Sequence, residues 1–168
     1  MSATSKTEQW LEKTIQVATW SKDLDLQDRV GCVIVDGNNL VSWGWNHTLD
    51  GTCMRDAAGK ARPFVVHAET AAIQDALIDM DSGTYTSRLT AYCSKEPCLH
   101  CLVQLAYAGV REVHFIDSVP EPKSGKQYLK HFPSIEIYKH HADQLPKLLR
   151  ALGVGSGVSP EPATSTQA

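Results

Sequence analysis

The sequence predicts an α/β fold of three layers, in which a five-stranded mixed sheet carries helices on both faces. β-branched and apolar runs alternate along the chain with runs that have helical spacing. The first two strand-like runs are separated only by a short turn, which predicts an antiparallel hairpin. The last two are separated by a candidate helix, which would let them lie parallel through a right-handed crossover.

The first part of the chain predicts a helix followed by the hairpin. Apolar residues recur at helical spacing over residues 8–21, which indicates a helix with one buried face. Residues 30–35 and 40–45 are apolar and predict two strands, and Asp-Gly-Asn-Asn at 36–39 is typical of the turn between them. Residues 46–62 show no helical or strand periodicity, which predicts a long loop. Loops of this length in a compact domain usually have a function.

The middle of the chain repeats a simpler pattern of strand and helix. Apolar residues 64–66 lead into a predicted buried helix over residues 68–78. Residues 89–93 predict a short strand. An apolar helix over residues 98–108 follows, and Gly109 is expected to end it because glycine accepts the left-handed conformation that closes many helices.

The last part of the chain predicts two more strands. Residues 112–116 and 135–138 have strand composition, and residues 124–132 between them predict a short helix. Residues 142–152 predict a final helix. From residue 153 to residue 168 glycine, serine, proline and threonine dominate, which predicts a disordered tail.

Composition limits the class of protein. The 168 residues are 42% hydrophobic and 21% charged, which suits a single globular domain over residues 1–152. The formal net charge of -3 argues against a general polynucleotide binder. No apolar run approaches the roughly 20 residues that span a bilayer, and the polar N-terminus lacks a signal-peptide core. Five cysteines, two of them in a C-x-x-C, suit metal binding in a reducing compartment, so we expect a cytoplasmic protein.

Two short motifs predict a zinc site. His67 and Glu69 form H-x-E, and Cys98 and Cys101 form P-C-x-x-C, each at the start of a predicted helix. The two cysteines share a face of the first turn, where the helix amino end also favours thiolates. One imidazole and two thiolates hold zinc and leave a fourth position for water. Glu69 lies about 200° around the helix from His67, so we expect it to act on that water as a general acid and base.

Other interpretations of these residues exist. A C-x-x-C alone is also typical of a redox pair or of half a structural zinc site. A structural site needs further ligands close by, and Cys93, His100 and His114 add no second C-x-x-C or H-x-x-x-H. A non-catalytic zinc-binding module would have no need of a carboxylate beside the metal. The two motifs in this order therefore favour a catalytic zinc ion.

These residues resemble the cytidine deaminase superfamily, and the deoxycytidylate deaminase branch in particular. The H-x-E followed by P-C-x-x-C is that superfamily's signature. The resemblance extends over roughly residues 11–140 and includes residues 21–23, 30–35 and 44–46, the last of which is similar to the G-Y-N of the branch.

The resemblance implies a cytidine-deaminase-like fold, a zinc cofactor and a homo-oligomer that acts on a small nucleotide. The reaction would be the hydrolytic deamination of a cytosine nucleotide, dCMP to dUMP plus ammonia, in pyrimidine nucleotide supply. Asn46 would hold the sugar of the substrate, and Ala68 and Ser94 are the other expected substrate contacts. Neither a polynucleotide nor a membrane is an expected partner.

Some positions depart from the pattern of the branch. His47 replaces a glycine, Leu49 a proline and Ala71 an asparagine. The segment Glu96-Pro97-Cys98 is similar to the E-P-C that guanine deaminases and tRNA adenosine deaminases often carry. A deaminase of another free base or nucleoside, such as guanine, is therefore the alternative, and what His47 contacts stays open.

Basic and aromatic side chains near the predicted loops have two possible roles. Four basic residues near the predicted loops could bind a phosphate: Arg29, Lys60, Arg62 and Lys123. For each one singly, a solvated surface charge is the simpler interpretation. Trp43 and Trp45 could stack on a base, but their alternation along a strand favours a place in the core or an interface.

Overall fold

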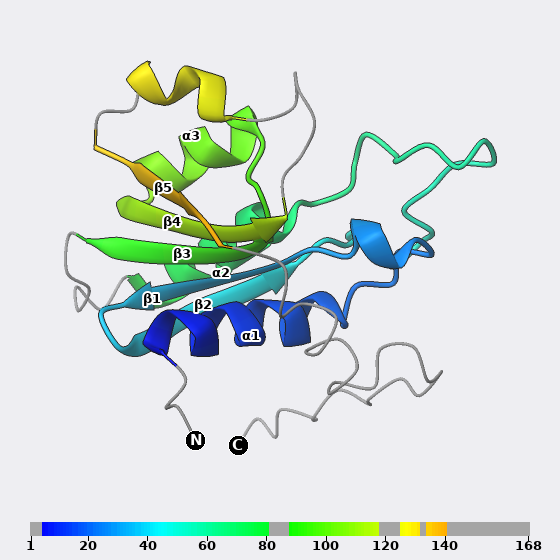
Figure 1. Cartoon of the computed structure of the whole chain (residues 1–168). Coiled ribbons are helices and arrows are strands. Elements are labelled where there is room, and N and C mark those ends of the chain that lie inside the picture. The colour runs from blue at the N-terminus through cyan, green and yellow to red at the C-terminus, as the bar shows by residue number, and fades with distance from the viewer. Residues whose placement is uncertain (1–4, 81–87, 118–124, 132–133, 141–168) are drawn as a thin grey trace.

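The sheet has five strands in the order β2-β1-β3-β4-β5 (Figure 1). The structure is a computed structural model that describes residues 5–80, 88–117, 125–131 and 134–140. The strands are β1 (Gly31–Asp36), β2 (Asn39–Trp45), β3 (Leu89–Lys95), β4 (Val110–Asp117) and β5 (Glu136–Lys139). The predicted five-stranded sheet is confirmed, with each strand within three residues of its expected limits.

The sheet is mixed, as predicted. β1 runs antiparallel to both β2 and β3, whereas β3, β4 and β5 run parallel to one another. The 3₁₀ helix η2 (Lys126–His131) lies where a helix was expected between the last two strands. Two parallel neighbours need a connection that returns from the carboxyl end of β4 to the end of the sheet where β4 begins. This segment lies in that connection, so β5 can run parallel to β4.

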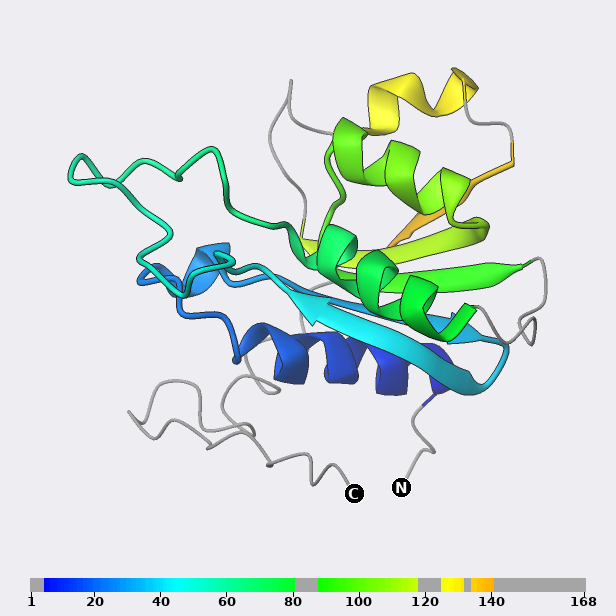
Figure 2. The same cartoon turned by 180° about the vertical axis from the view of Figure 1, so that it is seen from behind.

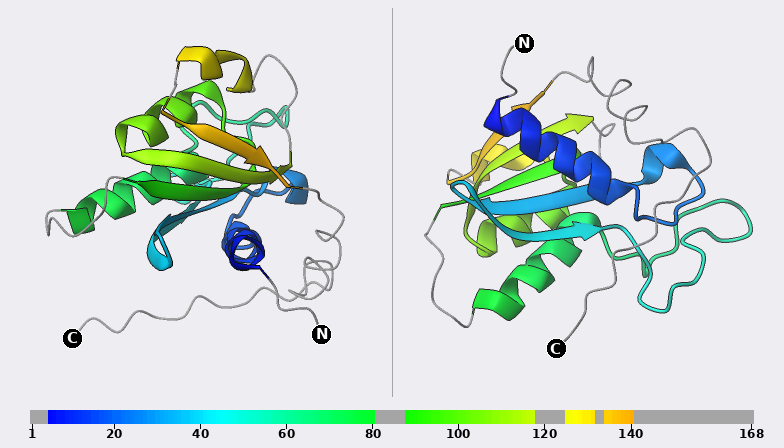
Figure 3. Two further views of the ribbon diagram at one scale, coloured as in Figure 1. Left: turned by 60° about the vertical axis from the view of Figure 1, so that its left-hand side comes forward. Right: turned by 90° about the horizontal axis from the view of Figure 1, so that it is seen from below.

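Helices cover both faces of the sheet. α1 (Lys6–Ala18) packs on one face, and α2 (Ala68–Met80) with α3 (Leu99–Tyr107) packs on the other (Figures 2 and 3). α1 begins earlier than predicted because Ser5 and Glu8 form a capping box at its amino end. α3 is followed by Gly109 at a φ of 90°, as expected for the residue that ends a helix.

The sheet separates two apolar clusters. One fills the space between the sheet and α2 and α3, and it contains Ala68, Ala72, Leu102, Leu105 and Phe115. The other lies under α1 and combines aliphatic residues with aromatic ones, which include Trp10, Trp20, Trp43, Trp45 and Tyr92. The sheet thus divides the core into a mostly aliphatic cluster and a cluster of aliphatic residues bordered by aromatic ones.

Some expectations need correction. α2 is not buried all round, because Gln74 and Asp75 are exposed and 53% of Leu77 is exposed. The apolar run 64–66, which leads into α2 as expected, contributes a single antiparallel bridge from Val66 to His47. The predicted helix 142–152 and tail 153–168 lie outside the described residues.

The loop between β2 and α2 projects from one edge of the sheet (Figure 1). Within it, Arg55 and Ala61 form an antiparallel bridge, and Asp56 Oδ1 accepts hydrogen bonds from the backbone of Ala58 and Lys60. This loop is therefore internally ordered by its own bonds. Among the helices of the described ranges, none combines the length and apolarity needed to cross a membrane.

Candidate metal centre

The start of β1 and the ends of β2, β3 and β4 meet at one edge of the sheet. The register pairs Gly31 with Trp45, Cys32 with Cys93 and Lys95 with Asp117. α2 and α3 both begin at this edge, because each follows directly from a segment that leaves it (Figure 2). Two helix amino ends therefore lie close together at the same place.

The predicted zinc ligands come together between these helix ends. His67 directly precedes α2, Cys98 is the N-cap of α3, and Cys101 lies in the first turn of α3. His67 Nδ1 lies 3.3 Å from Cys101 Sγ and 3.7 Å from Cys98 Sγ. A tetrahedral zinc ion holds a nitrogen and a sulfur ligand about 3.6 Å apart. The three side chains therefore fit a zinc ion as they stand.

The protonation of the two thiols also suits a metal site. The pKa of Cys98 is lowered to about 3, because its sulfur accepts hydrogen bonds from Cys101 and His67. The pKa of Cys101 is raised, because its thiol donates to Cys98 and is buried. Cys98 makes no capping bond to α3, so its sulfur is available to a ligand. One thiolate is thus already in place, and binding of zinc would displace the proton on the other.

Glu69 lies beside the same cluster. It stands in the first turn of α2 and is only 4% exposed. Burial raises the pKa of this carboxyl, and a hydrogen bond with Cys101 opposes the rise. A buried carboxyl beside three metal-ligating groups can exchange a proton with whatever occupies the open position of the metal. The geometry therefore agrees with the place expected for Glu69.

A glycine in β2 allows α2 to reach this position. A Cβ atom at Gly44 would lie 2.4 Å from the carbonyl oxygen of Ala68 and 2.4 Å from the backbone nitrogen of Ala72. Ser42 Oγ also donates a hydrogen bond of 2.8 Å to the Ala72 carbonyl. The first turn of α2 therefore packs directly on the backbone of β2, and this contact fixes the height of His67 and Glu69 above the sheet.

Comparison with known proteins decides the family. The family described as "Cytidine and deoxycytidylate deaminase zinc-binding region" matches residues 4–117, which include all three ligands and Glu69. The chain belongs to this family. Its members are zinc-dependent hydrolytic deaminases, so the family and the site agree on the cofactor and on the type of reaction.

Individual relatives agree with the family. A deoxycytidylate deaminase of Saccharomyces cerevisiae is 29% identical over 116 residues, which are 62% of this chain and 36% of the yeast protein. One of Schizosaccharomyces pombe is 31% identical over 101 residues, which are 52% of this chain and 30% of that protein. The match therefore spans about a third of the length of these relatives.

The fold has a close counterpart among solved structures. The dCMP deaminase of cyanophage S-TIM5, solved with dCMP and dUMP, superposes with a TM-score of 0.68 over 83% of this chain and 100% of that one. The two sequences are 24% identical, so this likeness concerns the fold. It confirms the predicted cytidine-deaminase-like architecture.

The expected substrate contacts have structural partners. The Asn46 side chain accepts a hydrogen bond of 2.8 Å from Val30 N and donates one of 2.9 Å to the Asp28 carbonyl. Ser94 Oγ accepts a 3.0 Å bond from Gly31 N, and Ala68 is fully buried at the start of α2. All three line the zinc edge of the sheet, and their contact with substrate stays a prediction.

The other aromatic candidates, and two of the basic ones, have contacts within the fold. Trp43 and Trp45 pack edge-on against Trp20, on the α1 side of the sheet, which is the core position that alternation favoured. Arg29 donates to the Asp23 carbonyl, and Arg62 donates to the Arg55 carbonyl. The guanidinium groups of both arginines therefore donate hydrogen bonds to backbone carbonyls. Lys60 is exposed, and Lys123 lies outside the described residues.

Two further departures have a place in the fold. His47 Nδ1 donates a 2.8 Å hydrogen bond to the Trp45 carbonyl, and the His47 backbone bridges to Val66, next to the first zinc ligand. Glu96 is buried directly before Pro97 at the end of β3. Both lie at the zinc edge of the sheet.

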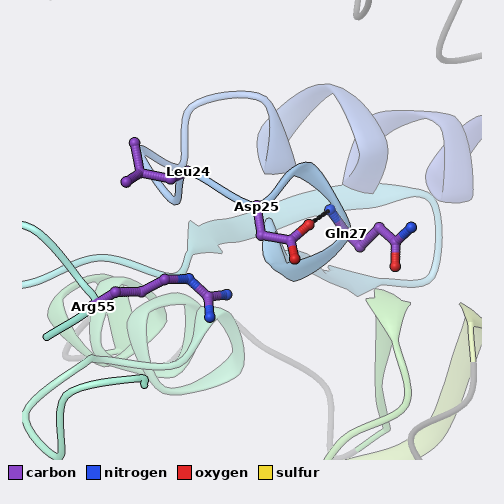
Figure 4. Close-up of a pocket in the computed structure, with 4 residues that line it drawn as sticks. All are labelled: Leu24, Asp25, Gln27 and Arg55. Atoms are coloured by element: carbon purple, nitrogen blue, oxygen red, sulfur yellow. Dashed lines mark hydrogen bonds between the residues drawn. The ribbon is translucent and has the colours of Figure 1, made fainter. Parts of the chain in front are cut away.

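Sequence reasoning missed the polar contacts that surround the metal centre. Thr70 on α2 donates to Gln104 on α3, and Gln104 bonds His100, which joins the two ligand-bearing helices. Arg55, from the projecting loop, reaches the 3₁₀ turn η1 (Leu26–Asp28) beside a shallow hollow that Leu24, Asp25 and Gln27 also line (Figure 4). This hollow lies next to the zinc edge and is separate from the ligand cluster. Only the spacing of His100 and Gln104, four residues apart, gave a signal in the sequence.

Proposed function

We propose that this chain deaminates a cytosine nucleotide, converting dCMP and water to dUMP and ammonia in pyrimidine nucleotide supply. The observation that carries the proposal is the buried carboxylate of Glu69 against the His67, Cys98 and Cys101 cluster. Two curated relatives are named deoxycytidylate deaminases, and a protein of the same fold was solved with dCMP and dUMP. These likenesses support the substrate class.

The residues of the chain divide the chemistry between them. His67, Cys98 and Cys101 would hold zinc, which when bound lowers the pKa of a water molecule toward neutrality. Glu69 would take a proton from this water at its carboxylate and deliver it to the ring nitrogen next to the reacting carbon. The oxygen adds to that carbon, Glu69 takes the remaining proton from the added hydroxyl, and it passes this proton to the amino group as the carbon–nitrogen bond breaks and ammonia leaves. Water therefore supplies the oxygen of the product, one proton to the ring nitrogen and one proton to ammonia.

The surroundings of Glu69 suit this role. The carboxyl lies in the buried first turn of α2, and Gly44 fixes the helix against β2. A carboxylate held in this way exchanges a proton without having to reorganise, which favours general acid and base catalysis. We further propose a cytoplasmic homo-oligomer as its working form, on the basis of cysteine usage and the family resemblance.

The test is ammonia release by the zinc-loaded protein with dCMP, CMP, deoxycytidine, cytosine, guanine and adenosine. We expect turnover of dCMP, and we expect Glu69→Gln to keep zinc and to lose activity by about a thousandfold. Zinc content of both proteins, measured by atomic absorption, is the control. An active Glu69→Gln variant would remove Glu69 from the mechanism.

Glu96 before Pro97 and Cys98 favours a second candidate, the deamination of guanine. Turnover of guanine in place of dCMP would keep the roles of the zinc ligands and of Glu69 and would replace the substrate. Release of ammonia from none of the six compounds, with zinc bound, would contradict both candidates.

A further inference from the structure

Three connecting segments meet at the zinc edge of the sheet. One joins α1 to β1 over residues 19–30, one is the projecting loop over residues 46–66, and one joins β3 to α3 over residues 96–98. The second segment leads directly to His67, and the third contains Cys98. Any change in how these segments sit against one another would move the zinc ligands.

Arg55 fastens the projecting loop to the first segment. Its Nε lies 2.8 Å from Asp23 Oδ1, its Nη2 pairs with Asp28 Oδ2, and its Nη1 donates a 2.9 Å bond to the Gly59 carbonyl. The Asp23 side chain is 6% exposed and that of Arg55 is 20% exposed. Because the Asp23 carboxylate is buried, the Arg55–Asp23 pair is screened less than a fully exposed pair.

Asp28 also forms an ion pair with Lys95, the residue directly before the third segment. Its Oδ1 lies 3.1 Å from Lys95 Nζ, and the same ammonium donates a 2.7 Å bond to the Gln27 carbonyl. Burial raises the pKa of Asp28, but hydrogen bonds from Arg55 and Lys95 outweigh this and lower it. Lys95 is the last residue of β3 and lies three residues before Cys98.

These contacts make Arg55 unsuited to bind a substrate phosphate. Three of its nitrogens already have acceptors, and the hollow beside it contains the carboxylate of Asp25, which would repel an anion (Figure 4). Arg55 therefore holds the loop, and the phosphate must be recognised elsewhere.

We propose that Asp23, Asp28, Arg55 and Lys95, here called the ion network, position the zinc ligands. The ion network ties the segment before His67 to the segment before Cys98, and Asp28 and Arg55 are positioning residues for the reaction. The inference rests on the zinc-dependent function proposed above. A metal site loses affinity when the groups that orient its ligands are removed, because the ligands no longer meet at one point.

The test compares the full-length zinc protein with Asp28→Asn, with Lys95→Met and with the double variant. Asp25→Asn is the matched control, since Asp25 lies in the same segment and its hydrogen bond from Gln27 N survives in asparagine. Release of zinc to an excess of a chromophoric chelator is followed by absorbance. kcat and KM for dCMP and the urea midpoint of unfolding are measured on the same preparations.

We expect Asp28→Asn and Lys95→Met each to release zinc about three to ten times faster and to lower kcat by a similar factor. The double variant should be less affected than the sum of the two single variants, because both substitutions remove the shared Asp28–Lys95 contact. Asp25→Asn should stay within about twofold of the parent. Zinc release needs no substrate, so this result is independent of whether dCMP is turned over.

Three results would overturn the proposal. Equal zinc release by Asp28→Asn and Asp25→Asn would show that the ion network does not act on the metal site. A rise in KM with unchanged zinc release and unchanged kcat would make these residues substrate ligands. Faster release that follows only the fraction of unfolded protein would make them contributors to stability alone.

Discussion

The two faces of the sheet are packed in different ways. On the face of α2 and α3, small residues such as Ala68, Ala72 and Ala76 bring helix and sheet into close contact. On the face of α1, larger aliphatic residues are buried and partly buried tryptophans pack against them, with Trp20 edge-on to both Trp43 and Trp45. The two faces thus differ in the size of the side chains at the helix–sheet contact, although each helix touches the sheet backbone closely, α2 at Gly44 and α1 at Gly31.

This difference matches the chemistry that each face carries. The zinc ligands and Glu69 all lie at the start of the helices on the small-residue face. A metal site requires its ligands to be placed within a few tenths of an ångström, and close packing supplies that accuracy. The α1 face supplies stability to the same sheet and contains none of the predicted catalytic residues.

The largest expected effect is on the metal itself. Cys98→Ser should lower zinc content by at least about tenfold after dialysis against a chelator, because serine does not replace a thiolate as a zinc ligand. kcat/KM should fall in proportion. The matched control is Cys53→Ser, which alters an exposed cysteine of the projecting loop. Equal zinc loss in both variants would contradict the assignment of Cys98.

Two glycines give a sharper comparison of the faces. Gly44→Ala would place a Cβ atom 2.4 Å from the backbone of α2, and Gly31→Ala would place one 2.1 Å from the Thr14 carbonyl of α1. Each should lower the free energy of unfolding by about 1–3 kcal/mol, because backbone atoms have to move. Urea titration measures this loss.

The same two variants should differ in activity. The kcat/KM of the folded fraction should fall more for Gly44→Ala, since the displaced helix carries His67 and Glu69, than for Gly31→Ala, which displaces α1. An equal loss of activity in both variants would mean that the two faces contribute alike to the geometry of the site.

The smallest expected effect concerns pH and the α1 side of the sheet. His114 stacks on Tyr92 and Tyr138 and bonds His140, and burial with the nearby His140 lowers its pKa. Since protonation is easier in the unfolded chain, His114 should reduce stability as pH falls below about 6.5. His114→Gln should make the free energy of unfolding depend less on pH between pH 7 and pH 5.5. A steeper dependence in the variant would reverse the sign of this contribution.

Local patterns predicted the elements of this fold well. Helical spacing located α1, α2 and α3, and strand composition located all five strands, because each pattern depends on neighbours in the sequence. The limits of α1 were less accurate, since Ser5 caps the helix from outside the apolar pattern. The exposure of Leu77 was missed because spacing does not show which side of a helix the sheet covers.

The sequence by itself determined which side chains form the candidate metal site, since His67, Cys98 and Cys101 each stand at a helix start that short-range spacing can locate. It also determined the order of strands and helices that brings those starts to one edge. Only the tertiary structure decided what surrounds them. Asp23 and Arg55 are 32 residues apart, and Asp28 and Lys95 are 67 apart, so no period in the chain relates them. Their charges meet because the folded sheet brings three connecting segments to the same edge, and a contact made in that way leaves no local pattern to read.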